Sequence, residues 1–457
     1  MIELSPNAGG FRRATATIVS ALLMLLTAAV PIAAQKAAVD NCVSCHEGLD
    51  GGPASVTALE AGSVHRHAGF TCAGCHGGDP GADDAELSMS AAKGFVGAPA
   101  PAAVAEFCGR CHSDAAIMKR FNPATRIDQQ TEYASSGHGK TLAKGDTKVA
   151  TCVSCHGSHG ILKVDDANAP VHPLNVAKTC GSCHGNKDLM TAYGVFTDQV
   201  AHYRTSVHAI ALHEKQDLSA PTCNDCHGNH GAAPPGVASV AHVCGTCHVR
   251  QSDLYAASPH MKPFTEGGIA GCVACHGEHG IARPVDEHLG SGPASMCRSC
   301  HSEGDKGWRA GEQLRSGLAM MELSIAAADR SLARASEAGM EVSRPEFELR
   351  DARDKLVNAR VMIHSLSVAD VDSLVASSQA TSTKAKEAGI AAMHELDYRR
   401  NGLGLSLVVI MVAAVSVYVK VRTIERGRAG RTGAGASRPV TNGAHGAGGT
   451  KMPMGDA

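Results

Sequence analysis

The sequence has few aromatic residues and no excess charge of either sign. Phe, Tyr and Trp make up 3% of the 457 residues, and Trp occurs once, although aromatic side chains dominate most protein cores. Lys and Arg number 42 against 44 Asp and Glu, so the chain lacks the basic footprint of a nucleic-acid-binding protein. A chain of this length has room for about two to four domains. Something other than aromatic side chains must supply apolar bulk to their cores.

The N-terminus has the features of a secretory signal peptide, predicted over residues 1–34. Arg12 and Arg13 precede an uncharged stretch centred on IVSALLMLLTAAV, and Ala33 and Ala34 provide small residues for cleavage. An uncleaved N-terminal anchor is the alternative, because the stretch is long. The arginine pair also resembles a twin-arginine signal, although two arginines are common in the basic region of ordinary signal peptides. Either way the cysteine-rich part is predicted to be exported, to a compartment where free thiols pair as disulfides.

A second apolar run, LGLSLVVIMVAAVSVYV, covers residues 403–419 without a charge. Its length is at the short end of a membrane-spanning helix. More basic residues follow it than precede it, which places its C-terminal side in the cytoplasm. We therefore expect a transmembrane helix over 402–420 and a disordered cytoplasmic tail over 421–457, which is rich in Gly, Ala and Arg. A buried helix of a soluble protein is the alternative.

Every cysteine belongs to a CxxCH motif. The nine motifs consume all 18 cysteines, and each ends in a histidine. The cysteines are Cys42, Cys45, Cys72, Cys75, Cys108, Cys111, Cys152, Cys155, Cys180, Cys183, Cys223, Cys226, Cys244, Cys247, Cys272, Cys275, Cys297 and Cys300. The motif histidines are His46, His76, His112, His156, His184, His227, His248, His276 and His301.

The spacing of the motif suits covalent haem attachment. Two cysteines three positions apart can form thioethers with the two vinyl groups of a haem, and the adjacent histidine then faces the iron. Structural zinc sites use paired CxxC units and give no reason for a histidine after each one. Disulfides also leave the histidines unexplained. The motifs therefore predict nine covalent c-type haems, each with its iron.

Residues 42–301 resemble a bacterial multihaem c-type cytochrome along their whole length. Nine haems in this segment would leave about 29 residues for each. The resemblance implies a mainly α and irregular fold in which haems form the core and loops with short helices surround them. Such a core accounts for the missing aromatic residues. We predict an N-terminal three-haem segment over 35–125 and a six-haem segment over 126–306.

The six-haem segment contains an internal repeat. Each unit begins with Y-x-x-S-x-H, continues with CxxCHGxHG and ends with a plain CxxCH, so it supplies two haem motifs and two further histidines. The Y-x-x-S-x-H histidines are His138, His208 and His260. A degraded copy begins near His65 and has Gly78-Asp79 in place of the second histidine. The motif at 42–46 stands alone before it.

The additional histidines are candidates for the second axial ligand of each iron. An iron with two histidines is a low-spin electron carrier, whereas an open sixth position binds substrate; a surface or hydrogen-bonding role is the alternative for each histidine. His159 follows His156 after two residues, which span at most about 10 Å. It is too close to reach the opposite face of the same haem and is predicted to bind the next one. The predicted ligands are His65, His138, His159, His172, His208, His230, His260, His279 and His288.

Residues 307–401 have the pattern of a helical bundle. Apolar residues recur at alternating steps of four and three from Leu314 to Ala335 and from Leu349 to Leu366. Gly339 is placed to end the first helix, and Ser343 with Glu346 has capping-box spacing at the start of the second. A third helix is expected to run toward the membrane span. The segment predicts a three-helix stalk that seats the haem domain above the membrane.

The resemblance implies a membrane-anchored carrier that relays electrons in anaerobic respiration, and it favours an electron carrier over an oxidoreductase enzyme. It would lie in the bacterial inner membrane with its haem domain in the periplasm. Its partners would be a quinol-oxidising membrane complex and a periplasmic or outer-membrane acceptor. The alternative is a reductase of a nitrogen or sulfur oxyanion at one five-coordinate haem, for which His46, His76 and His112 are the candidates. Long helices after a haem region also resemble the layout of multihaem nitrite reductases, but their CxxCK motif does not occur here.

Overall fold

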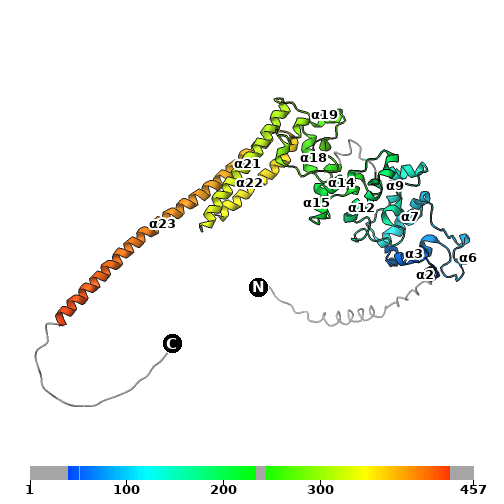
Figure 1. Cartoon of the computed structure of the whole chain (residues 1–457), viewed down its shortest axis with the longest axis horizontal. Coiled ribbons are helices and arrows are strands. Elements are labelled where there is room, and N and C mark those ends of the chain that lie inside the picture. Colours follow the sequence, from blue (N-terminus) through cyan, green and yellow to red (C-terminus); the bar gives the residue numbers. More distant parts are fainter. Residues whose placement is uncertain (1–39, 51, 233–242, 433–457) are drawn as a thin grey trace, which may run out of the picture. The chain divides into compact units, whose positions relative to one another are not determined.

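The computed structural model describes residues 40–50, 52–232 and 243–432. Within these ranges the chain forms helices, turns and loops and contains no strand (Figure 1). The predicted mainly α and irregular fold class, with a long apolar helix at its C-terminal end, is confirmed for these residues. The predicted signal peptide lies outside the described residues. The chain divides into two compact units, Met1–Val243 with Cys272–Arg283, and Cys244–Gly271 with Pro284–Ala457.

The first unit consists of short helices joined by loops. Three of them, α5, α11 and α16, are single turns formed by a CxxCH motif. The helices are α2 (Asn41–Glu47), α3 (Gly52–Glu60), α4 (Val64–His67), α5 (Cys72–His76), α6 (Ala85–Ser88), η1 (Ala91–Lys93), η2 (Pro101–Ala103), α7 (Val104–His112), α8 (Ala115–Phe121), α9 (Gln129–Ser135), α10 (Gly137–Ala143), α11 (Cys152–His156), α12 (Pro173–His184), α13 (Lys187–Met190), η3 (Thr191–Tyr193), α14 (Gln199–Arg204), α15 (Val207–His213), α16 (Cys223–His227) and α20 (Gly271–His276).

Little of the first unit's core is made by apolar side chains. Its one buried hydrophobic cluster among the described residues contains Ala177, Tyr203 and Ala209, with the thiol-bearing Cys223 packed against it. A domain of this size normally buries a much larger apolar core. The polypeptide therefore surrounds its haem motifs with only a small side-chain core of its own, as the scarcity of aromatic residues predicts.

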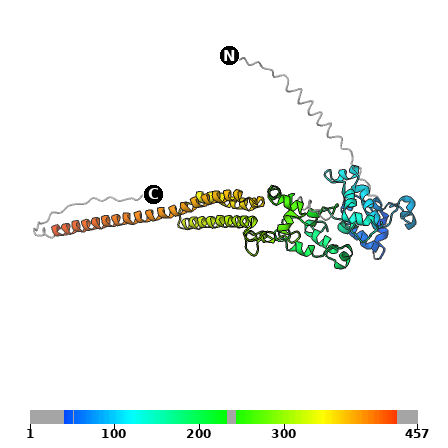
Figure 2. The same ribbon diagram turned by 90° about the horizontal axis from the view of Figure 1, so that it is seen from above.

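The second unit is dominated by three long helices that pack side by side (Figure 2). These are α21 (Lys306–Glu337), α22 (Ser343–Met362) and α23 (Val368–Thr432). The shorter helices of this unit are α18 (Val249–Ala256), α19 (Met261–Glu266), η4 (Asp286–His288), η5 (Cys297–Ser299) and η6 (Ile363–Ser365). The residues of the predicted apolar stripes are buried where the three helices meet, including Leu314, Leu318, Met321, Leu332, Leu349 and Ala352.

Local sequence sets the ends of the first two bundle helices. Asp305 caps α21 by accepting a hydrogen bond of 2.8 Å from the backbone N–H of Trp308, and Gly339 follows its end with φ of 80°, a conformation that favours glycine. The predicted capping box between Ser343 and Glu346 does not form. Instead the carboxylate of Glu341 accepts a hydrogen bond of 2.9 Å from the N–H of Ser343.

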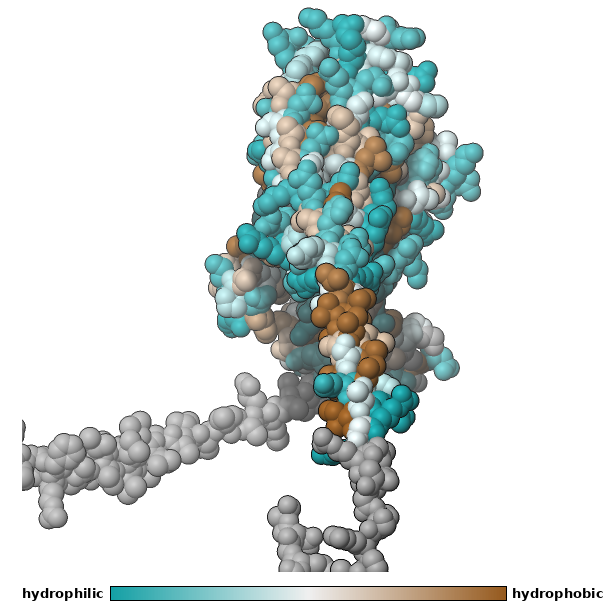
Figure 3. Space-filling view, turned by 90° about the vertical axis from the view of Figure 1, so that its left-hand side faces the viewer, coloured by the Kyte–Doolittle hydropathy of each residue, from teal (hydrophilic) through white to brown (hydrophobic). Residues whose placement is uncertain are grey.

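The third bundle helix continues without a break through the predicted membrane span. α23 has 65 residues, which corresponds to about 98 Å at 1.5 Å per residue. Its apolar segment has a mean hydropathy of 2.4 and is fully exposed, and its hydrophobic side chains form a band on the molecular surface (Figure 3). By length and composition this helix can cross a membrane. The helix also includes residues 421–432, which were expected to begin the disordered tail; residues 433–457 lie outside the described part.

Candidate haem-binding sites

The first CxxCH motif of each repeat unit is followed by a glycine with positive φ. The motif itself is one helical turn, and in α11 the side chain of Ser154 accepts a hydrogen bond of 3.0 Å from the backbone N–H of Thr151, which stabilises its start. Gly157 follows with φ of 81°, and Gly77, Gly228 and Gly277 have φ between 71° and 84°. Residues with side chains rarely adopt this conformation. The glycine therefore ends the haem-binding turn abruptly and directs the following histidine away from it.

The second histidine of CxxCHGxHG, which we call the HG histidine, lies against a motif histidine of the preceding unit. The rings of His159 and His76 have centroids 6.1 Å apart. The separation is 6.1 Å for His230 and His156 and 6.0 Å for His279 and His227. In all three pairs the ring planes are within 16° of parallel. The HG histidine thus does not lie against the following haem motif, where the sequence predicted the partner of His159. It reaches two motifs back.

The histidine of Y-x-x-S-x-H lies against a different kind of partner. His138 is 6.1 Å from His184, centroid to centroid, and His260 is 5.9 Å from His301. Each partner is the histidine of the plain CxxCH motif in the same unit. The CxxCHGxHG motif of that unit lies between the two paired histidines in the sequence. His65 of the degraded copy pairs with His112 in the same way, at 6.0 Å. These ring planes are inclined by 33° to 78°.

The six pairs are spaced to hold one metal ion between two imidazoles. Two metal–nitrogen bonds of about 2.1 Å in line, together with about 1.1 Å from each nitrogen to its ring centroid, require roughly 6.4 Å. The observed separations are 5.9 to 6.1 Å. Each pair therefore fits an iron that is ligated from both faces, with a CxxCH motif at one side to attach the haem.

Comparison with known proteins agrees with this geometry. The protein family described as "Doubled CXXCH motif" matches residues 262–306, which contain the last two motifs. This match supports a c-type multihaem cytochrome. No curated protein and no solved structure matches it. Its CxxCH motifs accordingly bind haem c covalently, and the haem supplies a one-electron iron couple when bound.

Eight of the paired histidines have a lowered pKa, which favours the neutral imidazole that binds metal. Burial is the main cause, because it disfavours the charged imidazolium; in most pairs the partner imidazole adds to the effect. The histidines whose pKa is lowered in this way are His112, His138, His156, His159, His184, His230, His260 and His279.

Hydrogen bonds orient two of the motif histidines. Nδ1 of His76 lies 2.8 Å from the carbonyl oxygen of Val96, and Nδ1 of His301 lies 3.2 Å from Oδ2 of Asp305. A histidine that donates from one nitrogen to an oxygen presents the other nitrogen, unprotonated, to a metal. Nε2 is therefore the ligating atom of both rings in the haem-loaded protein.

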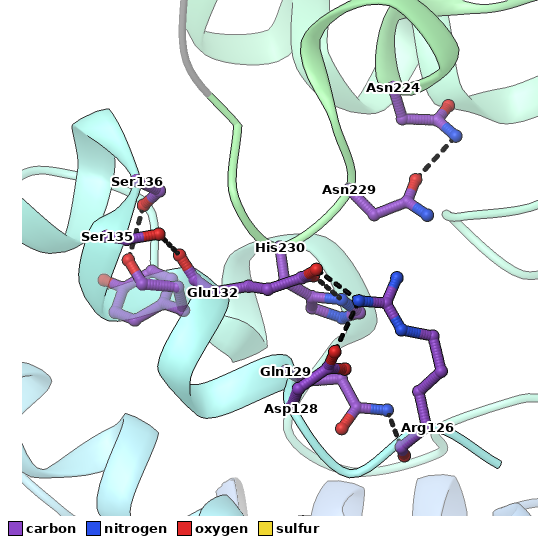
Figure 4. Close-up of polar contacts among 10 residues, drawn as sticks. Arg126, Asp128, Gln129, Glu132, Ser135, Ser136, Asn224, Asn229 and His230 are labelled. Atoms are coloured by element: carbon purple, nitrogen blue, oxygen red, sulfur yellow. Dashed lines mark hydrogen bonds and ion pairs between the residues drawn. The ribbon is translucent and has the colours of Figure 1, made fainter.

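A carboxylate lies beside His230 in a cluster drawn in Figure 4. Oε2 of Glu132, from α9, is 3.9 Å from Nδ1 of His230, and the same carboxylate pairs with Arg126, which also binds Asp128. The carboxylate favours a protonated Nδ1, so Nε2 again faces the partner ring. His279 has a similar neighbour, since its Nδ1 is 3.6 Å from a carboxylate oxygen of Glu278.

The Tyr and Ser of Y-x-x-S-x-H position the ligand helix. The hydroxyl of Tyr133 donates to the carbonyl of Ala150, 2.9 Å away and two residues before Cys152; Tyr203 makes the equivalent bond to Pro221 at 3.0 Å. Ser136 accepts a hydrogen bond of 2.9 Å from Gly139 and so caps α10, which carries His138. The motif therefore fastens the histidine-bearing helix to the start of the next haem-binding turn.

Two predicted ligands, His172 and His288, each hold one ring nitrogen in a hydrogen bond to the backbone. Nδ1 of His172 accepts a hydrogen bond from the N–H of Leu174 at 3.3 Å, and Nδ1 of His288 accepts one from Val285 at 3.4 Å. Both cap a helix with one nitrogen, and a ligand role for the other stays a prediction. A ligand role for His208 also stays a prediction. This histidine is the second residue of α15, as His138 is the second residue of α10. Among the described residues, no histidine ring lies against His46.

Proposed function

We propose that this protein is a nonahaem electron carrier whose haems are ligated by two histidines and pass electrons from one to the next. The observation that carries the proposal is the set of six histidine pairs at iron-bridging separation. An iron with two protein ligands has no position for a substrate, so its chemistry is limited to gaining and losing an electron.

The proposed location is the bacterial inner membrane, with the haem motifs in the periplasm and the C-terminus in the cytoplasm. The apolar, exposed part of α23 supports a membrane anchor, and the basic residues after it support this orientation. The proposed partners are a quinol-oxidising membrane complex and a periplasmic or outer-membrane acceptor. The continuous helix from bundle to span would hold the second unit at the membrane surface.

Spectroscopy of the full-length holoprotein tests the carrier function. Intact mass should exceed that of the processed polypeptide by nine haems. Low-temperature EPR of the oxidised protein should show low-spin ferric haem, and dithionite followed by a protein oxidant should cycle all of it. A mass increase of fewer haems would contradict the count, and predominantly high-spin iron would contradict ligation by two histidines.

A second candidate function is reduction of a nitrogen or sulfur oxyanion at the haem of residues 42–46. In each pair of inclined rings, the histidine of a plain CxxCH motif contacts a histidine that lies before the preceding CxxCH motif in the sequence. The motif at 42–46 is the first, and residues 1–41 contain no histidine. His46 also lacks a ring partner among the described residues, whereas His76 and His112, the other two candidates, are paired.

The EPR spectrum of the oxidised holoprotein also distinguishes the reductase from the electron carrier. One high-spin ferric haem in nine, whose signal changes when nitrite or sulfite is added, would support the reductase. Combining Cys42→Ala with Cys45→Ala removes this haem, which should then abolish that signal and leave the low-spin haems unchanged. Nine low-spin haems would exclude the reductase.

A further inference from the structure

Consecutive haem motifs of the first unit meet through their cysteines. The thiols of Cys108 and Cys152, the first cysteines of the third and fourth motifs, share a hydrogen bond, which raises the pKa of Cys108. Cys180 and Cys223, the first cysteines of the fifth and sixth motifs, share another, which raises the pKa of Cys180. Haem attachment converts these thiols to thioethers, which do not titrate. The hydrogen bonds show that the two sulfur atoms of each pair are neighbours.

The intervening motifs meet through their second cysteines. Cys111 of the third motif is an electrostatic neighbour of Cys75 of the second, and Cys183 of the fifth motif is one of Cys155 of the fourth. Arg110 bridges the second and third motifs, because its guanidinium donates a hydrogen bond of 2.7 Å to the carbonyl of Cys75.

Contacts between the helices support the same order. α2 contacts α5, α7 contacts α11, and α12 contacts α16. Each of these is a contact between consecutive motifs that meet through first cysteines, and Cys42 of the first motif has Cys72 of the second as a neighbour. The ring of His156 also lies near that of His112, and the ring of His184 near that of His227.

The contacts between successive motifs alternate along the chain. One motif meets the next through the first cysteines of both, and the following contact is made through the second cysteines. Every motif from the second to the fifth therefore meets the motif before it through one cysteine and the motif after it through the other. We infer that these cysteine pairs are the joints of a single line, in which the first six haems stand in sequence order with their thioether edges facing one another. This inference rests on the proposed electron-carrier function and adds a route to it.

The route is simple in its chemistry. The cysteine pairs would hold consecutive haems next to each other, and each haem would supply a one-electron iron couple, so that one iron would be oxidised while its neighbour is reduced. No bond is made or broken and no proton moves. The electron comes from a one-electron protein donor at one end of the line and is passed to a protein acceptor beyond the other.

A cryo-EM structure of the full-length holoprotein tests the order directly. The nearest neighbours among the first six irons should be those consecutive in sequence, and the thioether sulfurs of Cys108 and Cys152 should face each other. An adjacent pair out of sequence order, or thioether edges that point apart, would overturn the inference. That result would leave haem content and low-spin EPR intact, so it is distinguishable from failure of the carrier function.

A kinetic experiment tests the joints as the route. Cys152→Ala and Cys155→Ala each leave the fourth haem on one thioether, at opposite joints. Cys45→Ala is the matched control, because Cys45 is exposed and meets no other motif cysteine among the described residues. After pulse-radiolytic reduction, both joint variants should redistribute electrons more slowly than the control. Equal rates in all three, with nine haems retained, would overturn the route; if a variant loses haem, the cryo-EM order decides.

Discussion

The imidazole of His159 lies parallel to that of His76, at a centroid separation of 6.1 Å, and not against His156, which precedes it by three residues. The same relationship recurs for His230 with His156 and for His279 with His227. Each HG histidine therefore connects two successive repeat units by contacting a motif histidine of the unit before it. His156 and His159 are only three positions apart in the sequence, but their rings contact histidines of different repeat units.

Replacing His159 with Ala should convert the haem of residues 72–76 to high spin. The reason is that His76 loses the ring opposite it, while the haem at 152–156 keeps the ring of His230. Oxidised-state EPR should show one high-spin haem with full haem content, and added imidazole should restore low spin. His67→Ala, at an exposed position, is the control.

The location of that high-spin haem can be checked by removing it. Combining His159→Ala with Cys72→Ala and Cys75→Ala eliminates the haem at 72–76, and the high-spin signal should disappear with it. If the signal persists, the high-spin iron is elsewhere and the pairing of His159 with His76 is wrong.

The low-spin haems should fall into two EPR classes. The orientation of the two imidazole planes sets the splitting of the iron d orbitals, and the planes are within 16° of parallel in the HG pairs but inclined by 33° to 78° in the others. The inclined class should give the more axial signal. His138→Ala should remove intensity from that class and His230→Ala from the parallel class; loss from one common signal would contradict the distinction.

Asp305→Asn should raise the midpoint potential of the haem at 297–301. The carboxylate lies 3.2 Å from Nδ1 of His301 and so increases the basicity of the ligating nitrogen, which stabilises the oxidised iron. We expect a shift on the order of 59 mV, a tenfold change for a one-electron couple. Asn still caps α21, so the bundle should be unaffected. Redox titration measures the shift, with exposed Glu303→Gln as the control.

Leu318→Ala should destabilise the helical bundle without changing the haems. Leu318 is fully buried between the three helices, and removal of such a side chain costs about 2–5 kcal/mol. Thermal unfolding followed by far-UV circular dichroism should show the loss, with an unchanged visible spectrum at room temperature. Leu323→Ala, at a position 69% exposed on the same helix, should be close to wild type.

The bundle should also lose stability in acid through Glu348. Hydrogen bonds from Lys384 and Arg344 lower the pKa of this carboxyl. A lowered folded-state pKa means that the stabilisation is complete above the unfolded-state pKa, about 4.3, and is lost as the pH falls through the folded-state value. Urea unfolding should therefore separate wild type from Glu348→Gln more widely at pH 7 than at pH 3. An equal separation at both pH values would argue against the ion pairs.

The features that could be predicted from the sequence are those that depend on neighbouring residues. The CxxCH motifs form single turns because two cysteines and a histidine within five residues fit one turn. The apolar stripes from Leu314 to Ala335 and from Leu349 are buried because helical periodicity places them on one face. The membrane-compatible part of α23 follows from composition alone. The capping box at Ser343 failed because another nearby carboxylate, that of Glu341, competes for the same N–H.

The sequence by itself determined that this chain binds haem repeatedly, in which turns, and on what kind of helical support. The tertiary structure alone decided which histidines face each other and which cysteines are neighbours. A repeat shows that a histidine recurs at a fixed position, but its partner depends on how successive units stack, which is a long-range property. His159 reaches His76 because the glycine turn after His156 directs it out of its own unit. The distances that hold an iron exist only once the units are packed together.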